Sequence, residues 1–335
     1  MRIFLIGDYK SGTGPANVTN DLLHCLPFNT LYLKYNNKIL RTYEIISKMF
    51  KIDICVFSGY SRQNILGMRI AKILKKPAIY LMHGCVEYEN AINGVPDIKM
   101  NKVERETLRL SNYILAVSEQ FETWLKANYK EYSRKIYHLT NGVNWKIMKE
   151  NATGEKRDPY KIFSIGGGMP RKKIVYIAEA IELLNKRGIP CTLTIAGDIG
   201  LDSEKLRQFP FVTDLSLIKK EEVLHQMHTS KIFIQNSCFE TFGLAPIEAL
   251  LCGCDILLSK EVGAISLFQE FRECDKINNF DNPEEIAEKI EFMLNHDNHS
   301  RLLVELDKES TSWEARATEL QSILKRIKEK KSLIG

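Results

Sequence analysis

Two glutamates near residue 240 stand eight positions apart, on either side of an aromatic-glycine step. The apolar run that ends at Gln235 predicts a buried strand. Pro246 is typical of the first position of a helix, and Gly253 of its end. Glu240 is therefore expected in the strand-to-helix loop and Glu248 in the first turn of the helix. Backbone N–H groups at such a helix start suit phosphate, and an ionised carboxylate beside them accepts hydrogen bonds from sugar or ribose hydroxyls, so the pattern predicts a nucleotide-sugar site.

A second candidate element, residues 164–173, places three glycines shortly before a run of three cations. Fixed cations are what a departing nucleoside diphosphate requires, because negative charge grows on its oxygens as the glycosidic bond breaks. Arg171 and Lys172, beside Gly166, are the candidates for this role. A solvated run of charges is the alternative interpretation.

Two further residues follow predicted strands, and one glycine loop follows the first strand. His83 and Asp198 lie at the carboxyl ends of two strand-like runs, where parallel sheets bind ligands. A lone histidine is often structural, however, and Asp198 fits a turn equally well. In the loop of residues 7–18, Gly12 and Gly14 allow the backbone to approach a phosphate. The loop does not match the G-x-G-x-x-G pattern of dinucleotide sites, so a structural turn is the alternative.

Strand-like runs alternate with helical segments along the whole chain, which predicts an α/β protein with parallel sheets covered on both faces. The polar segment 149–160 divides the runs into two sets, so we expect two Rossmann-like domains, 1–153 and 154–312. A final amphipathic helix is expected over about 313–328. The predicted strands are Arg2–Gly7, Thr30–Tyr35, Asp53–Gly59, Ala78–Gly84, Tyr113–Ser118, Lys135–Gly142, Lys161–Gly166, Cys191–Asp198, Phe211–Leu217, Lys231–Ser237, Asp255–Lys260 and Cys274–Asn278.

Taken together, these motifs resemble those of the GT4 family of retaining glycosyltransferases, which have the GT-B fold. The element from Glu240 to Glu248 resembles the signature of that family. Residues 141–144 (Asn-Gly-Val-Asn) resemble the motif before its interdomain linker. The Ser-Trp pair at 312–313 resembles the start of a last helix that crosses back to the N-terminal domain. The resemblance covers nearly the whole chain and implies two facing domains with the active-site cleft between them.

The resemblance also implies a reaction, in which a sugar moves from a nucleotide-sugar donor to an acceptor hydroxyl with its anomeric configuration retained. It assigns Glu240 to the donor-sugar hydroxyls, Glu248 to the ribose, and His83 to the sugar near the reacting carbon. The departing diphosphate itself would accept the proton of the acceptor. No cofactor is expected, and a UDP-sugar is the first choice of donor.

Arg171, Lys172 and the N–H groups at the helix start are expected to stabilise the diphosphate. Members of the family usually carry an arginine directly after the first glycine of this loop, but the chain has Gly167 there, and Arg171 is the expected substitute. Gly12 and Gly14 would border both the diphosphate and the acceptor. The other expected donor contacts are Gly166, Asp198, Phe242, Gly243 and Leu244.

Composition sets the location and the partners that we expect. An apolar content of 44% and a charged content of 27% are those of a soluble globular protein. The chain shows neither a membrane-spanning run nor a signal peptide, so we expect it in the cytoplasm. The basic stretches 34–51 and 69–76 carry apolar residues at roughly helical spacing. They fit either helices packed on a sheet or a peripheral contact with the anionic inner face of the plasma membrane.

A basic N-terminal half and the habits of the family suggest a saccharide acceptor that is lipid-linked, in the synthesis of bacterial capsule, exopolysaccharide or O-antigen. No recognised nucleic-acid-binding module is present, so no nucleic-acid partner is expected. The chain contains no D-x-D sequence, which disfavours the metal-dependent GT-A class and predicts a metal-independent, hexosyltransferase-like enzyme with no metal site.

Three other interpretations stay open at this point. The carboxylate pair could serve a glycoside hydrolase, although its place beside a phosphate-binding helix start favours holding a donor. A nucleotide-sugar epimerase shares the two-domain architecture. A catalytically weak scaffold of a polysaccharide assembly complex could retain the same residues.

Overall fold

The computed structural model describes residues 1–35, 37–149 and 156–329, which form two compact units. The predicted domain boundary between residues 153 and 154 lies outside the described residues. Unit 1 comprises Met1–Glu87, Asp97–Gly142 and Glu309–Gly335, and unit 2 comprises Tyr88–Pro96 and Val143–Lys308.

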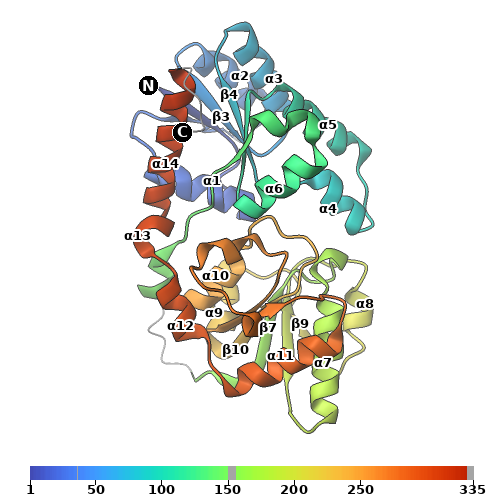
Figure 1. The fold of residues 1–335 in the computed structure, drawn as a ribbon. Helices are drawn as coiled ribbons and strands as arrows, with labels where there is room; N and C mark the ends of the chain where they lie inside the picture. The colour runs from blue at the N-terminus through green and yellow to red at the C-terminus, as the bar shows by residue number, and fades with distance from the viewer. Residues whose placement is uncertain (36, 150–155, 330–335) are drawn as a thin grey trace. The chain divides into compact units, whose positions relative to one another are not determined.

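Within the described residues, unit 1 is built on a six-stranded parallel sheet with the order β2-β1-β3-β4-β5-β6 (Figure 1). The strands β3 and β4 are buried over their whole length, as expected for parallel strands that helices cover on both faces. The order reverses between β1 and β3, so the carboxyl ends of these strands form the expected ligand edge. The strands are β1 (Ile3–Ile6), β2 (Leu31–Tyr32), β3 (Ile54–Ser58), β4 (Ala78–Met82), β5 (Tyr113–Ala116) and β6 (Ile136–His138).

The last helix of the chain, α14 (Trp313–Lys328), belongs to unit 1 and packs against the first, α1 (Gly14–Cys25) (Figure 1). Its start explains two motifs of the sequence. The Ser312 side chain accepts a hydrogen bond from Ala315 N, and a Cβ on Gly142 would lie 2.5 Å from Trp313 Cδ2. Only a glycine therefore lets the chain pass over the indole. The other helices of this part are α2 (Lys38–Met49), α3 (Arg62–Ile73), α4 (Val86–Ile92, whose first two residues belong to unit 1), α5 (Ile98–Leu110), α6 (Glu119–Asn128) and α13 (Lys308–Thr311).

In unit 2, the described residues form a second six-stranded parallel sheet, with the order β12-β11-β10-β7-β8-β9. This is the doubly wound order of Rossmann domains, and its reversal lies between β7 and β10. The twelve predicted strands are confirmed, each with narrower bounds than predicted, except β7, which begins three residues earlier, and β10, which begins one residue earlier and ends two residues earlier. The strands are β7 (Asp158–Ile165), β8 (Thr192–Ala196), β9 (Val212–Asp214), β10 (Ser230–Gln235), β11 (Asp255–Ser259) and β12 (Lys276–Ile277).

The helix after β10 begins earlier than predicted. Pro246 is the third residue of α10 (Leu244–Leu251), not the first, and Glu248 is the fifth residue, beyond the first turn. A proline is tolerated there because the N–H groups of the first turn have no intrahelical acceptor. The predicted end is correct, since Gly253 follows the helix with φ of +94°. The other helices of unit 2 are α7 (Ile174–Lys186), α8 (Ser203–Leu206), α9 (Lys220–Thr229), α11 (Pro283–Asn295) and α12 (His299–Glu305).

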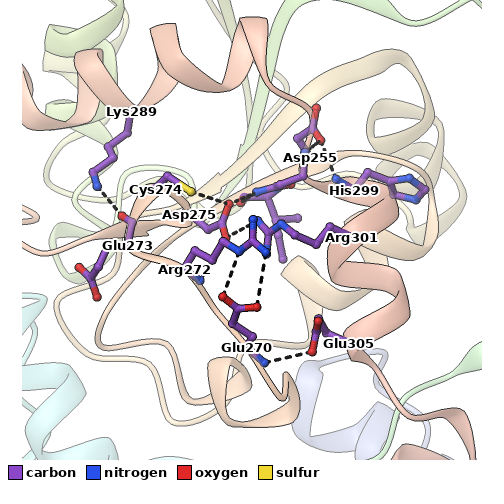
Figure 2. A network of polar contacts seen from close by, with 12 residues as sticks. Asp255, Glu270, Arg272, Glu273, Cys274, Asp275, Lys289, His299, Arg301 and Glu305 are labelled. Atoms are coloured by element: carbon purple, nitrogen blue, oxygen red, sulfur yellow. Dashed lines mark hydrogen bonds and ion pairs between the residues drawn. The ribbon is translucent and has the colours of Figure 1, made fainter.

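A buried polar network connects the amino ends of β11 and β12 to α12 (Figure 2). Asp255, which is 2% exposed, accepts from the backbone N–H groups of Asn298 and His299 at the start of α12, at 2.6 and 2.8 Å. Lys231 lies 2.7 Å from its other oxygen. Arg301 pairs with Asp275 in the same network. Asp255 thus stabilises unit 2 at the end of the sheet opposite to the ligand edge.

Unit 1 exposes apolar side chains on α2 and α3, two helices that pack against each other. Ile39, Tyr43, Ile46 and Phe50 recur at helical spacing along α2 and the residue after it, and all four are exposed. The packing interpretation of this basic stretch is confirmed for Ile45 and Met49, which α2 buries, whereas these four side chains are left uncovered. Over the described part of the chain, no helix has the length and hydropathy needed to span a membrane.

Candidate functional site

The cations of unit 2 follow a glycine loop that starts at the end of β7. Gly166 and Gly167 have φ of +141° and +54°. A Cβ on Gly167 would lie 2.1 Å from the carbonyl oxygen of Asp198, and one on Gly166 would lie 2.4 Å from Lys172 Cγ. Gly167 thus lets the loop pack on the backbone that follows β8, and Gly166 leaves room for the stem of Lys172. The arginine that the family usually carries at the Gly167 position does not fit this loop conformation.

Glu240 brings the polar side chains of the site together. Its Oε2 accepts from Lys172 Nζ at 2.5 Å and from Gln235 Nε2 at 2.6 Å, and Arg171 NH1 lies 3.5 Å away. The loops after β7 and β10 can meet here because these strands are neighbours at the reversal of strand order. The side chains of Arg171, Lys172 and Glu240 are 14%, 13% and 13% exposed. They form a nearly buried ion cluster at the ligand edge of unit 2.

Opposite charges set the protonation states of Glu240 and Arg171, whereas burial lowers the pKa of Lys172. Burial alone would raise the pKa of Glu240, but Lys172 and Arg171 outweigh it and hold this pKa below its ordinary value. Burial opposes the charge of Arg171 as well, yet Glu240 and Glu89 raise the pKa of its guanidinium. Glu240 is therefore ionised at neutral pH. A glycoside hydrolase needs a carboxyl group with a raised pKa as its acid, so Glu240 does not fit that role.

Arg171 is held by backbone and by the segment Tyr88–Pro96, which belongs to unit 2. Its NH1 donates to the carbonyl oxygen of Phe239 at 3.1 Å, and its NH2 lies 3.3 Å from Glu89 Oε2. Its backbone N–H donates to Asn93 Oδ1 at 3.2 Å. Its Nε is buried and has no hydrogen-bond partner among the described residues. The cluster thus leaves one guanidinium donor unused.

The start of α10 adds backbone donors beside the cluster. Gly243 precedes this helix with φ of +91°, and the first N–H groups of a helix have no intrahelical acceptors. Phe242 is buried, and its carbonyl oxygen accepts from Ala264 N at 2.7 Å, which fixes the loop. Glu248, on the same helix, forms an ion pair with Lys220 of α9. Both glutamates of the signature are thus paired with lysines.

In unit 1, His83 lies directly after β4 and beside the end of β3. Its Nε2 is 2.7 Å from Ser58 Oγ, and burial lowers its pKa to about 4, so the imidazole is neutral at pH 7. Gly12, in the loop after β1, has φ of +74°, which favours glycine. Gly14 opens α1, and a Cβ there would meet no atom within 4 Å. Contact of either glycine with a ligand stays a prediction.

The structure thus brings together Arg171, Lys172 and Glu240, with the start of α10 beside them. Asp198 is exposed, and its backbone carbonyl accepts from Gly168 N at 3.1 Å, which is the turn role that the sequence left open. Residues that the sequence interpretation missed are Gln235, Glu89, Lys220, Ser58 and Thr19. Gln235 and Ser58 are the last residues of β10 and β3 and lie near the carboxyl ends of predicted strands, so the rule that placed His83 could have found them too.

No group of three or more His, Cys, Asp or Glu side chains that could hold a metal ion occurs in the described residues.

Residues 146–310 match the family model described as glycosyl transferases group 1. This match supports the resemblance to glycosyltransferases that the motifs predicted, over that range of the chain. The architecture, with two parallel α/β sheets, is the GT-B fold of glycosyltransferases.

Individual relatives cover different shares of the chain. The UDP-Gal:alpha-D-GlcNAc-diphosphoundecaprenol alpha-1,3-galactosyltransferase of Escherichia coli is 24% identical over 251 residues, which are 69% of this chain and 63% of that protein. Less than two thirds of that relative is thus matched. HepE of Anabaena, solved in complex with UDP, has a TM-score of 0.71 at 13% identity and covers 97% of this chain and 100% of its own. The catalytic domain of starch synthase IV from Arabidopsis thaliana, bound to ADP and acarbose, has a TM-score of 0.69 at 13% identity, over 98% and 99%.

Proposed function

We propose that the protein transfers a sugar from a nucleotide-sugar donor to a hydroxyl of a saccharide acceptor and retains the anomeric configuration. The observation that carries this proposal is the ion cluster of Arg171, Lys172 and Glu240 at the strand-order reversal of unit 2. Two cations beside the start of a helix offer the positive charge that a leaving nucleoside diphosphate requires. A UDP-sugar is the first donor to test, because HepE was solved with UDP and the Escherichia coli relative is named for UDP-Gal.

Donor binding would exchange the partners of this cluster. Without a ligand, Glu240 neutralises part of the charge of Lys172 and Arg171. An entering diphosphate can replace Glu240 as the partner of both cations. The carboxylate, which only accepts hydrogen bonds, would then turn to hydroxyls of the donor sugar.

Bond cleavage then shifts charge toward these cations. As the bond between the anomeric carbon and the diphosphate oxygen breaks, negative charge grows on that oxygen, so Lys172 and Arg171 stabilise the transition state more than the bound donor. The acceptor oxygen attacks from the face that the diphosphate leaves, and its proton passes to the diphosphate oxygen. The new bond therefore keeps the original configuration, and the two side chains supply the charge that a divalent metal supplies in other transferases.

The remaining predicted residues are proposed to bind other parts of the donor. Glu248 accepts hydrogen bonds from the ribose hydroxyls, with its carboxylate oriented by Lys220. His83 contacts the donor sugar. Gly12 and Gly14 border the diphosphate and the acceptor.

We propose further that the acceptor is lipid-linked and that unit 1 docks on an anionic bilayer. The apolar stripe of α2 (Ile39, Tyr43, Ile46 and Phe50) is exposed, and the neighbouring α3 exposes Ile73. The sequence of α3 contains no carboxylate, and the one carboxylate of α2, Glu44, is buried. Two of the cations are paired, Lys48 with Glu44 and Arg69 with Glu106, but cations outnumber carboxylates on these two helices. Exposed apolar side chains among surplus cations fit the interface of an anionic membrane, which suits synthesis of a bacterial cell-surface polysaccharide at the inner face.

Thermal stabilisation by a panel of UDP-, GDP- and TDP-sugars tests the proposed donor site. A ligand at 100 times its Kd stabilises the folded state by about 2.7 kcal/mol, and UDP or a UDP-sugar should raise the Tm accordingly. The Arg171→Ala, Lys172→Ala double variant should lose this rise. A panel without any effect on the wild-type Tm, or an equal rise in the double variant, would contradict the proposed site.

A further inference from the structure

A chain of buried hydroxyl groups leads from His83 to the start of α1. His83 Nε2 lies 2.7 Å from Ser58 Oγ, which lies 2.6 Å from Thr19 Oγ1. Thr19 Oγ1 in turn donates to the carbonyl oxygen of Pro15 at 2.8 Å. Ser58 and Thr19 are 7% and 2% exposed, and neither belongs to a motif that the sequence analysis singled out.

Gly7 makes room for this chain of contacts. A Cβ on Gly7 would lie 2.7 Å from Ser58 Cβ and 3.2 Å from Thr19 Cγ2. The absence of that atom lets α1 approach the end of β3 closely enough for the two hydroxyls to bond. The loop after β1, the end of β3 and the end of β4 are thereby joined at the ligand edge of unit 1.

The proton positions in this series of hydrogen bonds follow from the number of available donors. The carbonyl oxygen of Pro15 can only accept, so the single hydroxyl proton of Thr19 is used there. Thr19 must then accept from Ser58, and Ser58, whose proton is also used, must accept from His83. In the neutral imidazole, Nε2 therefore carries the proton and Nδ1 carries the lone pair.

We infer that Ser58 and Thr19 are positioning residues, which hold His83 as its Nε2–H tautomer so that Nδ1 accepts a hydrogen bond from a hydroxyl of the donor sugar. This role rests on the proposed function, whereas the tautomer itself does not. Burial keeps the imidazole neutral at physiological pH, so its tautomer rather than its charge decides what it can bind.

The substitution Thr19→Val offers a sharp test, since valine has nearly the same shape and lies away from the imidazole. Without an acceptor at residue 19, the Ser58 hydroxyl is free to donate to Nε2, which selects the Nδ1–H tautomer. Nδ1 is then a donor, and a sugar hydroxyl bound there must reverse its role. Thr19→Ser keeps the hydroxyl and is the matched control.

The experiment is 15N NMR of the imidazole nitrogens in the full-length protein, combined with kcat and KM for the donor. Wild type and Thr19→Ser should show a protonated Nε2, while Thr19→Val should show a protonated Nδ1 and at least a tenfold lower kcat/KM. An unchanged tautomer in Thr19→Val would overturn the inference at any level of activity. A reversed tautomer with full activity would overturn the positioning role. Failure of the proposed function is separate, because it appears as wild-type protein that makes no glycoside whatever its tautomer.

Discussion

Replacement of Lys172 by alanine removes the cation that contacts Glu240 at 2.5 Å. Arg171 is then the one remaining charged partner of Glu240 among the described residues, at 3.5 Å. If Lys172 stabilises the leaving diphosphate, its loss costs about 2.7–4 kcal/mol in the barrier, which is roughly a 100- to 1,000-fold fall in kcat. Loss of a merely structural ion pair would instead lower the Tm and leave kcat per folded molecule nearly unchanged.

The neighbouring Lys173 provides a matched control. It pairs with Asp281 at 2.8 Å and takes no part in the ion cluster. Lys173→Ala should leave kcat within about fivefold of wild type, since a partly exposed ion pair contributes at most about 1 kcal/mol. The assay is release of the nucleoside diphosphate at saturating donor and acceptor, with the Tm of each variant measured in parallel.

A methyl group at Gly166 perturbs the same contact without removing the lysine. In Gly166→Ala the new Cβ would lie 2.4 Å from Lys172 Cγ, so the stem must move away from Glu240. We expect most of the loss of Lys172→Ala to be reproduced. Undiminished turnover in Lys172→Ala, or an equal loss in Lys173→Ala, would refute the assignment of the diphosphate to this cluster.

Four further predictions concern metal, stability, pH and membrane binding. Turnover should be unchanged by EDTA, because side-chain cations supply the positive charge; loss of turnover that Mg²⁺ or Mn²⁺ restores would contradict this. Asp255→Ala should lower the free energy of unfolding by about 3 kcal/mol in urea titrations, because it leaves Lys231 and two N–H groups of α12 without their buried acceptor. Asp297, which is 75% exposed, provides the control, and Asp297→Ala should lower the free energy of unfolding by less than about 1 kcal/mol. His83 has a pKa near 4 in the folded protein, so its contribution to stability is fully present above pH 6.5 and is lost as the pH falls toward 4. Over that range the free energy of unfolding should fall by up to about 3 kcal/mol more in wild type than in His83→Gln. Equal losses in the two proteins would show that His83 is not buried as a neutral group. The double variant Ile39→Ser, Phe50→Ser should bind vesicles with anionic lipid at least tenfold more weakly than wild type, since burial of each side chain in the membrane contributes about 1.5–3 kcal/mol. Val304→Ser, at a similarly exposed site of unit 2, should bind like wild type. Equal binding of the two variants would exclude α2 as the contact with the membrane.

Local patterns were sufficient to predict the strands. Buried parallel strands are short, continuous apolar runs, so β3 and β10 are visible as such in the sequence. The glycine at the end of α10 was equally clear, since position 253 requires a left-handed backbone. The predicted start of this helix at Pro246 was wrong, because a proline is accepted throughout the first turn and does not mark its first residue.

Contacts that depend on strand order could not be predicted from local sequence patterns. Ser58 and His83 are 25 positions apart, and Gln235 meets Lys172 through Glu240 only because β10 pairs with β7. Only the structure explains why residue 167 is a glycine and not an arginine. A Cβ at this position would lie 2.1 Å from the carbonyl oxygen of Asp198, which is too close. Amphipathic spacing in α2 predicted a helix but not which apolar side chains the sheet would leave uncovered.

The most direct test of the central claim is NMR analysis of the product from a UDP-sugar and a diphospholipid-linked saccharide acceptor. We predict one new glycosidic linkage for each UDP released, with the anomeric configuration of the donor, and no product from the Lys172→Ala variant on the same timescale. Inverted configuration would contradict the proposed mechanism. Formation of a new nucleotide sugar without acceptor would instead identify an epimerase and contradict the proposed function.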